Sequence, residues 1–247
     1  DEFIAQLSKE DLVSLFRGEG MSSPKVTPGT GSAFGGLTES LRAFGIPAAC
    51  TTDGPSGLRF DVGTKAFSLP NGTLLGCTFN DELVEELYSI TSRELRRNRV
   101  DALLGPGINI HRHPLCGRNF EYISEDPFLT GKMGAAQIRG LNTVGTTGTI
   151  KHFCGNNQES RRYEVMGFIS QRALREIYLK GFEMCVKEAD ARAVMTTYGP
   201  VNGLWTAGSY DLNTLILRKE WGFDGIVMSD WWAEANIEGH KSDKRCR

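Results

Sequence analysis

The stretch GIVMSDWWAEAN, residues 225–236, places an apolar run directly before a carboxylate and two tryptophans. Residues 225–228 predict a buried strand, because a short apolar run bounded by polar residues is typical of a strand inside a sheet. Asp230 then stands at the C-terminal end of that strand. A carboxylate at this place can cap the next helix, or it can belong to a site built between aromatic side chains.

The same pattern recurs along the chain, where apolar runs alternate with helical patterns. The runs cover residues 46–50, 100–104, 148–150, 193–195 and 225–228. Helices are expected at 81–98 with Asn80 as N-cap, and at about 131–141, 170–188 and 211–220. Residues 1–16 predict one or two short amphipathic helices with Ser8 as a cap, and the Gly- and Ser-rich residues 17–36 predict a loop. This alternation indicates βα units and a mainly parallel sheet.

Polar side chains follow each of the five runs, and they predict the fold class. They are Asp53, Arg118, Lys151, His152, Tyr198 and Asp230. A (β/α)8 barrel builds its active site at the C-terminal ends of its strands, whereas an open doubly wound sheet uses only a switch point. We therefore expect an α/β fold of the (β/α)8 TIM-like barrel type, with residues 1–247 as one domain. The ending EGHKSDKRCR shows no evident last βα unit, so we expect the barrel to be incomplete there.

Composition and charge exclude several classes of partner. The net charge is −2, which gives neither a nucleic acid nor an anionic membrane a basic field to bind. The six cysteines are scattered without a CxxC pair and predict buried free thiols. Such thiols favour a cytoplasmic location, although a chain that begins at Asp1 leaves secretion open. No Walker loop or GxGxxG opens a helix, so we expect no cofactor.

Several short motifs carry candidate chemistry, each with a plain structural alternative. Tryptophan beside Asp230 suits a sugar, whose C–H faces pack on aromatic rings while its hydroxyls need polar partners. Lys151 and His152 are donors suited to hydroxyls, but neighbours on a strand point to opposite faces, so both reach one site only if the strand has ended. Otherwise they form a solvated pair. In DGPSG, Asp53 either belongs to a simple turn or accepts hydrogen bonds from two vicinal hydroxyls.

The segment CGRNFEYISEDP, residues 116–127, combines an arginine with three acids. It is either an internally salt-bridged loop or a loop in which Arg118 binds ligand hydroxyls while local acids hold it. The pair His111 and His113 offers a rival function, a metal-dependent barrel hydrolase. Such a site needs about four histidines with the late aspartate, and only three histidines precede Asp230. We therefore expect no metal.

Taken in order along the chain, the motifs resemble glycoside hydrolase family 3 of the β-glucosidase type. The resemblance spans about residues 5 to 236 and rests on DGPSGLR, GPGINIHRHPLCGRNFEYISEDP, IKHFCGNNQE, QRALREIYLKGFE, MTTYGPVNG and GFDGIVMSDWW. It implies a retaining glycosidase that releases terminal β-D-glucose, with Asp230 as the nucleophile. It also implies a sugar site in which Trp231 is a wall and in which hydroxyls are held, or the nucleophile oriented, by Asp53, Arg118, Lys151, His152, Arg162 and Tyr198.

The resemblance also implies that half of the mechanism lies elsewhere. One branch of the family carries a histidine acid/base just after the KHF segment, but KHFCGNNQESRRYEV has no histidine after His152. The chain thus resembles the other branch, in which a second α/β domain supplies a glutamate. That domain is expected outside this chain, because none of the local carboxylates Glu121, Glu159, Glu164 and Glu234 matches the family's pattern. A β-xylosidase, a β-N-acetylglucosaminidase and a non-catalytic sugar-binding protein remain alternatives.

Overall fold

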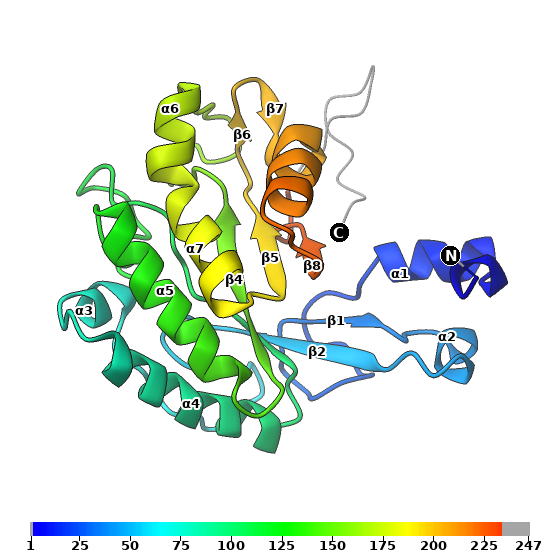
Figure 1. Ribbon diagram of the computed structural model, residues 1–247. Helices are drawn as coiled ribbons and strands as arrows, with labels where there is room; N and C mark the ends of the chain where they lie inside the picture. The colour runs from blue at the N-terminus through cyan, green and yellow to red at the C-terminus, as the bar shows by residue number, and fades with distance from the viewer. Residues whose placement is uncertain (1, 234–247) are drawn as a thin grey trace.

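The computed structural model describes residues 2–233, and its centre is a six-stranded sheet (Figure 1). The strand order is β1-β2-β3-β4-β5-β8, and β1 pairs antiparallel with β2 while every other pair is parallel. The bounds are Ser32–Gly35 for β1, Ala48–Asp53 for β2, Ala102–Leu104 for β3, Thr147–Phe153 for β4, Ala193–Thr196 for β5 and Ile226–Met228 for β8. All five predicted strands are therefore present and neighbour one another in chain order.

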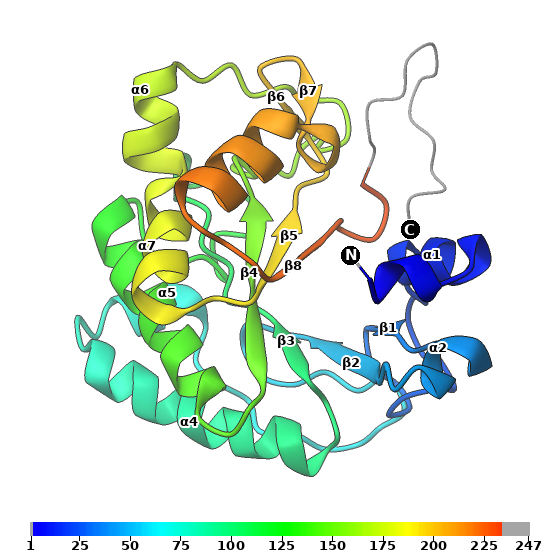
Figure 2. The ribbon, with the colours of Figure 1, turned by 45° about the vertical axis from the view of Figure 1, so that its right-hand side comes forward.

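Helices cover one face of this sheet, as they do in a barrel. Figures 1 and 2 show α4 (Asp81–Arg97), α5 (Pro127–Asn142) and α7 (Lys180–Ala189) in a row on the outside of the strands. The helical segment before α7 consists of α6 (Gln171–Ala173) and a π-helical turn (Leu174–Tyr178), and a second π-helical segment (Asp211–Glu220) precedes β8. The sheet is curled, and the prediction of an incomplete (β/α) barrel is confirmed for the described residues.

The hydrophobic core lies between the strands and these helices. Leu103, Ile150 and Val194 project from three neighbouring strands and are fully buried with Ile138 of α5 and Phe182 of α7. Burying side chains of this size stabilises the fold by about 1.5–3 kcal/mol each. The core thereby fixes the strands whose C-terminal ends build the site.

Glycine in α5 allows the helix layer to pack closely. A Cβ atom on Gly140 would lie 2.4 Å from the carbonyl oxygen of Glu85 in α4, so α4 and α5 can approach this closely only with glycine there. The helix begins at Pro127, four residues before the predicted start, because the Asp126 side chain caps it by accepting the Leu129 amide at 2.7 Å. Pro127 is compatible with this start, because a proline at the first helical position lacks an N–H that no residue of the helix would bind.

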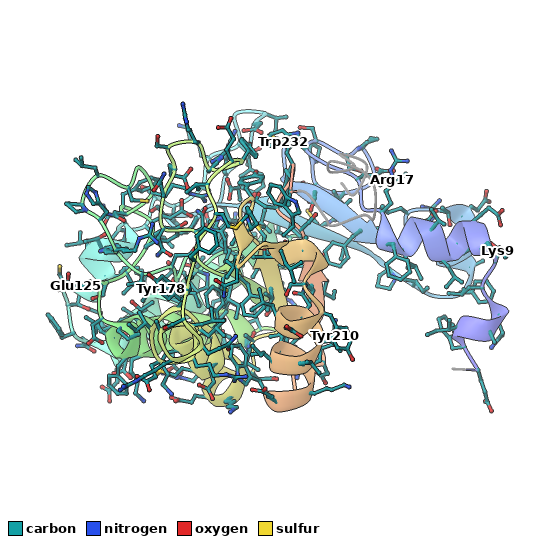
Figure 3. All side chains as sticks on the ribbon, turned by 90° about the horizontal axis from the view of Figure 1, so that it is seen from above. Lys9, Arg17, Glu125, Tyr178, Tyr210 and Trp232 are labelled. Atoms are coloured by element: carbon teal, nitrogen blue, oxygen red, sulfur yellow. The ribbon has the colours of Figure 1, made fainter. Side chains whose placement is uncertain are left out.

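The N-terminal segment extends to one side of the body. It contains a 3-10 turn (Ile4–Gln6), α1 (Lys9–Phe16), β1 and α2 (Glu39–Ala43), and Figure 3 shows Lys9 and Arg17 far from Glu125 and Tyr178. The predicted cap is confirmed, because Ser8 accepts the Asp11 amide in a capping box. The predicted loop at 17–36 is wrong for residues 32–35, which form β1. Four residues that include two small ones and a glycine give too short a pattern to reveal a strand.

Short elements complete the described chain. They are α3 (Gly72–Gly76), a hairpin of β6 (Pro200–Val201) and β7 (Leu204–Trp205), and a 3-10 turn (Thr206–Gly208). Three cysteines are buried free thiols as predicted, namely Cys50, Cys154 and Cys185, whereas Cys77 is exposed, Cys116 is partly exposed and Cys246 lies outside the described residues. Within residues 2–233, no helix combines the length and apolar character needed to cross a membrane.

Candidate active site

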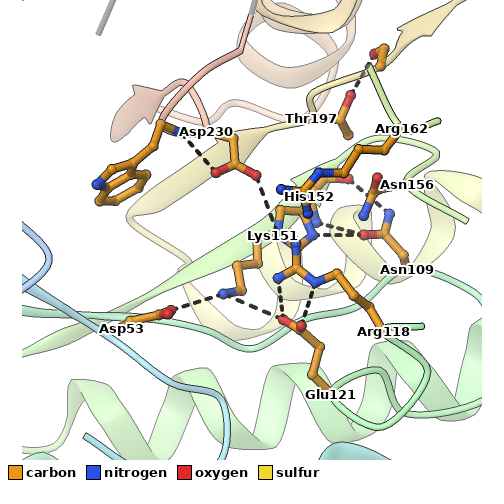
Figure 4. A network of polar contacts seen from close by, with 12 residues as sticks. Asp53, Asn109, Arg118, Glu121, Lys151, His152, Asn156, Arg162, Thr197 and Asp230 are labelled. Atoms are coloured by element: carbon orange, nitrogen blue, oxygen red, sulfur yellow. Dashed lines mark hydrogen bonds and ion pairs between the residues drawn. The ribbon is translucent and has the colours of Figure 1, made fainter. Parts of the chain in front are cut away.

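A pocket of about 440 Å³ opens at the C-terminal ends of the parallel strands. All eight residues that the sequence singled out line it, and they come from six segments of the chain: Asp53, Arg118, Lys151, His152, Arg162, Tyr198, Asp230 and Trp231. Figure 4 shows most of these side chains converging from separate strands and loops. The volume falls within the range of small-molecule pockets.

Asp230 lies just after β8, and the structure leaves its carboxylate under-coordinated. The residue is 6% exposed. Its Oδ1 atom accepts the Trp231 backbone amide at 2.8 Å, whereas Oδ2 is buried and has no hydrogen-bond partner among the described residues. Nε2 of His152 lies 3.7 Å from Oδ2. The alternative that Asp230 caps a following helix concerns residues 234–247, which lie outside the described part of the chain.

The surroundings of Asp230 act on its proton affinity in opposite directions. Burial raises the pKa of the Asp230 carboxyl, while the Tyr198 hydroxyl, the Trp231 amide and the charges of Lys151 and Arg118 oppose that shift. Burial and the negative charge of Asp230 raise the pKa of Tyr198, so this phenol stays protonated near the carboxylate. The arrangement supports a buried carboxylate that neighbouring donors and cations help to keep ionised.

Two cations near Asp230, the buried Lys151 and the half-buried Arg118, share one carboxylate. Arg118 donates to both oxygens of Glu121 at 2.6 and 2.8 Å, and the Nζ atom of Lys151 lies 3.5 Å from the same side chain. Lys151 also pairs with Asp53 at 3.4 Å (Figure 4). The loop is thus internally salt-bridged, and the arginine that Glu121 fixes also lines the pocket, while its binding of ligand hydroxyls stays a prediction.

Lys151 and His152 both line the pocket although β4 continues to Phe153. The expectation that both reach one site only after the strand has ended is therefore wrong. The register between β4 and β5 shifts between Ile150 and Phe153, so the regular alternation of side chains breaks at these two residues. The peptide bond between Lys151 and His152 is cis.

His152 is fully enclosed by polar side chains and cations. Its backbone amide donates to Asn109 Oδ1 at 2.8 Å, and its Nδ1 atom lies 3.1 Å from the Tyr122 hydroxyl. Burial lowers the pKa of His152 well below its usual value, and the positive charges of Arg118, Lys151 and Arg162 lower it further. The imidazole is therefore neutral at physiological pH.

Arg162 reaches the pocket from the loop after β4. Its Nη1 atom donates to Glu159 at 2.9 Å, and its guanidinium lies 4.5 Å from the centre of the Tyr198 ring. Such stacking restricts a planar cation to one orientation. The Nη2 atom also donates to the Tyr163 hydroxyl at 3.1 Å, so Glu159, Tyr163 and the Tyr198 ring together fix the guanidinium.

Trp231 forms a wall of the pocket and joins the two ends of the described sheet. Its indole N–H donates to the Gly31 carbonyl at 3.2 Å, next to the start of β1. Eight further residues line the pocket that the sequence did not single out as site residues: Met21, Gly29, Gly31, Arg59, Asp61, Leu104, Met195 and Trp232. Arg59 is part of the DGPSGLR motif and pairs with Asp61 at 2.9 Å, so its place in that motif was the available signal.

The three histidines that the structure describes do not assemble a metal site. The His111 ring contacts the Asn119 carbonyl at 2.9 Å, and His113 accepts the Leu115 amide at 3.1 Å, so both serve the local loop. No group of three or more metal-binding side chains occurs in the part of the chain that the structure describes. His240 lies outside that part. The metal-dependent alternative gains no support from this geometry.

A curled sheet with parallel strands, whose C-terminal ends surround a pocket of carboxylates, cations and an aromatic wall, defines a (β/α)-barrel protein with a site suited to a polyhydroxylated ligand. The chain belongs to the family of the glycosyl hydrolase family 3 N terminal domain, whose sequence profile matches residues 7–247.

Known proteins agree with this assignment. The chain is 66% identical over 244 residues to a β-glucosidase of Ruminococcus albus, covering 99% of this chain and 26% of that protein. The crystal structure of a β-glucosidase from Paenibacillus barengoltzii is 62% identical with a TM-score of 0.96, over 98% of this chain and 26% of that one. β-Glucosidase 3B from Thermotoga neapolitana in complex with glucose is 40% identical with a TM-score of 0.88, over 94% and 34%. The chain thus spans about a quarter to a third of these relatives.

Proposed function

We propose that this chain is the barrel domain of a retaining β-glucosidase that releases terminal β-D-glucose through a covalent intermediate on Asp230. The proposal is supported by the family and by the β-glucosidases similar to the chain. The observation that carries it is the buried Asp230 carboxylate, which lines the pocket with one oxygen lacking a hydrogen-bond partner among the described residues. A nucleophile needs this combination of a fixed position and incomplete solvation.

The reaction follows from the position of that carboxylate. A carboxylate oxygen of Asp230 attacks the anomeric carbon, the bond to the aglycone oxygen breaks, and an acid protonates the departing oxygen. Water activated by the conjugate base then cleaves the glycosyl ester and restores the carboxylate. Lys151 and Arg118 favour the ionised form of Asp230 that the first step requires.

The remaining pocket residues suit the hydroxyls and the ring of one glucosyl unit. Asp53 offers carboxylate oxygens to vicinal hydroxyls, while Lys151, Arg118, His152 and Arg162 offer donors. The Trp231 ring supplies the flat apolar wall against which the C–H face of a sugar packs. Tyr198 contributes a donor beside the nucleophile.

The acid/base is proposed to be a glutamate of a second α/β domain outside this chain. The other carboxylates at the pocket are engaged with cations: Asp53 with Lys151 and Arg59, Asp61 with Arg59, Glu121 with Arg118 and Lys151, and Glu159 with Arg162. None of these is free to protonate a leaving group. The greater length of the relatives leaves room for such a domain.

The stereochemistry and specificity of the intact protein test this function. Proton NMR of an aryl β-glucoside digest is expected to show β-glucose as the first product, with the α anomer appearing only by later mutarotation. Initial α-glucose would contradict the covalent mechanism. In a panel of aryl glycosides the β-glucoside is expected to have the highest kcat/KM. A preference for the β-xyloside or the N-acetylglucosaminide would reassign the substrate, and binding of glucose without turnover would indicate a sugar-binding protein.

The proposed division of labour between domains has its own test. Residues 1–247 expressed alone are expected to hydrolyse an aryl β-glucoside far more slowly than the intact protein, because no proton donor is in place. General acid catalysis contributes about 10²- to 10⁴-fold, which sets the expected deficit. Turnover by the isolated chain at the rate of the intact protein would refute the missing-acid argument.

A further inference from the structure

We propose that Tyr122 and Asn156 fix His152 in the tautomer that carries its proton on Nε2, so that His152 meets Asp230 and the sugar as a fixed hydrogen-bond donor. Tyr122 and Asn156 are then positioning residues, which act through the imidazole. The inference rests on the proposed function only for the identity of the ligand, because the tautomer itself follows from contacts among the protein's own residues.

A chain of hydrogen bonds runs from Arg162 to His152. It begins with a contact whose direction is known, because an arginine side chain only donates. Arg162 donates to Oε2 of Glu159 at 2.9 Å, and Oε1 of Glu159 accepts from Asn156 Nδ2 at 2.9 Å. An ionised carboxylate only accepts, so the Asn156 amide must turn its nitrogen towards Glu159. The same nitrogen lies 2.7 Å from the Tyr122 hydroxyl and therefore donates to it.

Because the buried Tyr122 hydroxyl accepts a hydrogen bond from Asn156, its own proton is free to be donated to the imidazole of His152. Its oxygen already accepts from Asn156, and Nδ1 of His152 at 3.1 Å is the acceptor available to its proton. If Nδ1 carried the proton instead, two N–H groups would point at one phenol oxygen. The phenol proton would then have no acceptor in the hydrogen-bond network that the structure describes. A buried donor without an acceptor costs free energy, so the geometry favours a bare Nδ1.

One competing acceptor for an Nδ1 proton must be weighed. Asn109 Oδ1 lies 3.3 Å from Nδ1, but it already accepts the His152 backbone amide at 2.8 Å. The Asn109 amide orientation is fixed, because its nitrogen donates to the His152 carbonyl at 2.9 Å. The distance from Nδ1 to Asn109 Oδ1 is longer than the distance from Nδ1 to the Tyr122 hydroxyl. A proton shared between Nδ1 and Asn109 would also leave the Tyr122 proton without an acceptor.

The opposite side of the ring points to the same tautomer independently. Nε2 faces the otherwise unpartnered Oδ2 of Asp230 at 3.7 Å. A proton on Nε2 turns the positive end of an N–H dipole towards that oxygen, whereas a bare Nε2 would oppose two lone pairs. Because 3.7 Å exceeds a hydrogen-bond distance, a ligand hydroxyl placed beside both atoms can accept from Nε2 and donate to Asp230.

This assignment gives His152 a defined chemical role. A neutral imidazole with its proton on Nε2 donates to the site but cannot take a proton there, and its other nitrogen is occupied by Tyr122. The low pKa that burial and the neighbouring cations give His152 keeps the ring from becoming an imidazolium acid. His152 therefore orients the sugar and the nucleophile, and the proton for the leaving group must come from another residue.

Nitrogen NMR of the intact protein tests the tautomer directly. With ¹⁵N-labelled histidine, and with a His152→Gln variant to assign the signal, wild-type His152 is expected to show a protonated Nε2 and an unprotonated Nδ1. In Tyr122→Phe the bare Nδ1 loses its donor, and the proton is expected to shift towards Nδ1 and Asn109. Tyr88→Phe is the matched control, since Tyr88 is equally buried and its hydroxyl donates to the Pro55 carbonyl at 2.8 Å.

Two results would overturn the inference. One is a protonated Nδ1 on wild-type His152, and the other is a Tyr122→Phe spectrum identical to that of Tyr88→Phe. These outcomes do not depend on glycosidase activity, so they are distinguishable from a failure of the proposed function.

Kinetics supply a second readout of the donor role. Tyr122→Phe is expected to lower kcat/KM about three- to tenfold, the effect of one lost hydrogen bond. His152→Gln retains an N–H donor near the Nε2 position and is expected to keep more activity than His152→Asn, which places its amide near Nδ1. Equal loss in the two variants would contradict a role for the Nε2 proton.

Discussion

Glu121 pairs with two cations of the pocket, the buried Lys151 and the half-buried Arg118, and replacing it by glutamine removes one charge with little change in shape. Its side chain is 6% exposed, against 19% for Arg118 and 4% for Lys151. In Glu121→Gln the arginine loses its carboxylate partner, and Lys151 keeps its 3.4 Å pair with the more exposed Asp53. The variant thus removes the carboxylate that both cations contact directly, and leaves only the charge of Glu159 to compensate the half-buried Arg118.

The expected cost follows from burial. Removing one partner of a buried ion pair destabilises a protein by about 3–5 kcal/mol. For a domain of this size, each kcal/mol moves the melting temperature by about 2–4 °C, so the domain's transition should fall by about 6–20 °C. KM for an aryl β-glucoside should rise as well, because Arg118 and Lys151 lose the contact that orients them.

Glu188→Gln is the matched control. Glu188 pairs with Lys132 at 3.4 Å, but both side chains are more than two-fifths exposed. An exposed pair contributes about 0–1 kcal/mol, so this variant should melt within about 4 °C of the wild type. Calorimetry of the intact protein makes the comparison. Equal melting temperatures for Glu121→Gln and Glu188→Gln would refute the claim that Glu121 holds the cation cluster.

Three further variants test other contacts. Burial raises the pKa of Asp230, so keeping this carboxylate ionised costs folding free energy at neutral pH, and that cost vanishes below the ordinary aspartate pKa of about 3.9. Asp230→Asn should therefore be inactive yet melt higher than wild type at pH 7, and the difference in melting temperature should close towards pH 3. Arg162→Lys loses the stack on Tyr198 and should raise KM about 5- to 30-fold with a smaller change in kcat; an unchanged KM would contradict its place in the sugar site. Trp231→Phe loses the hydrogen bond to Gly31 and should cost about 1 kcal/mol in denaturant unfolding while keeping most activity; a loss of activity without a loss of stability would reverse this reading.

The parallel strands could be predicted because each is a short apolar run followed by polar residues. The runs in β3, β4 and β5 are buried, but the prediction of a buried strand at 225–228 is wrong, because β8 is the edge strand of the described sheet and Ile226 is 46% exposed. The antiparallel β1 could not be predicted, because the four residues 32–35 are too few to show a period and glycine-rich sequence surrounds them.

Features of the site that depend on contacts between distant segments could not be predicted from the sequence. The approach of Lys151 and His152 to one pocket depends on an irregular register between β4 and β5, and no local pattern encodes it. The contact of Tyr122 with His152 joins residues 30 positions apart. In the sequence Tyr122 is one aromatic residue of a charged loop, and only the folded structure shows its contact with the imidazole of His152.

The central claim is that Asp230 forms the glycosyl-enzyme, and trapping that intermediate tests it most directly. A 2-deoxy-2-fluoro-β-glucoside with a good leaving group should inactivate the intact protein, because the fluorine slows hydrolysis of the ester. Peptide mapping by mass spectrometry is then expected to find the fluoroglucosyl group on Asp230. A label on any other carboxylate would contradict the account.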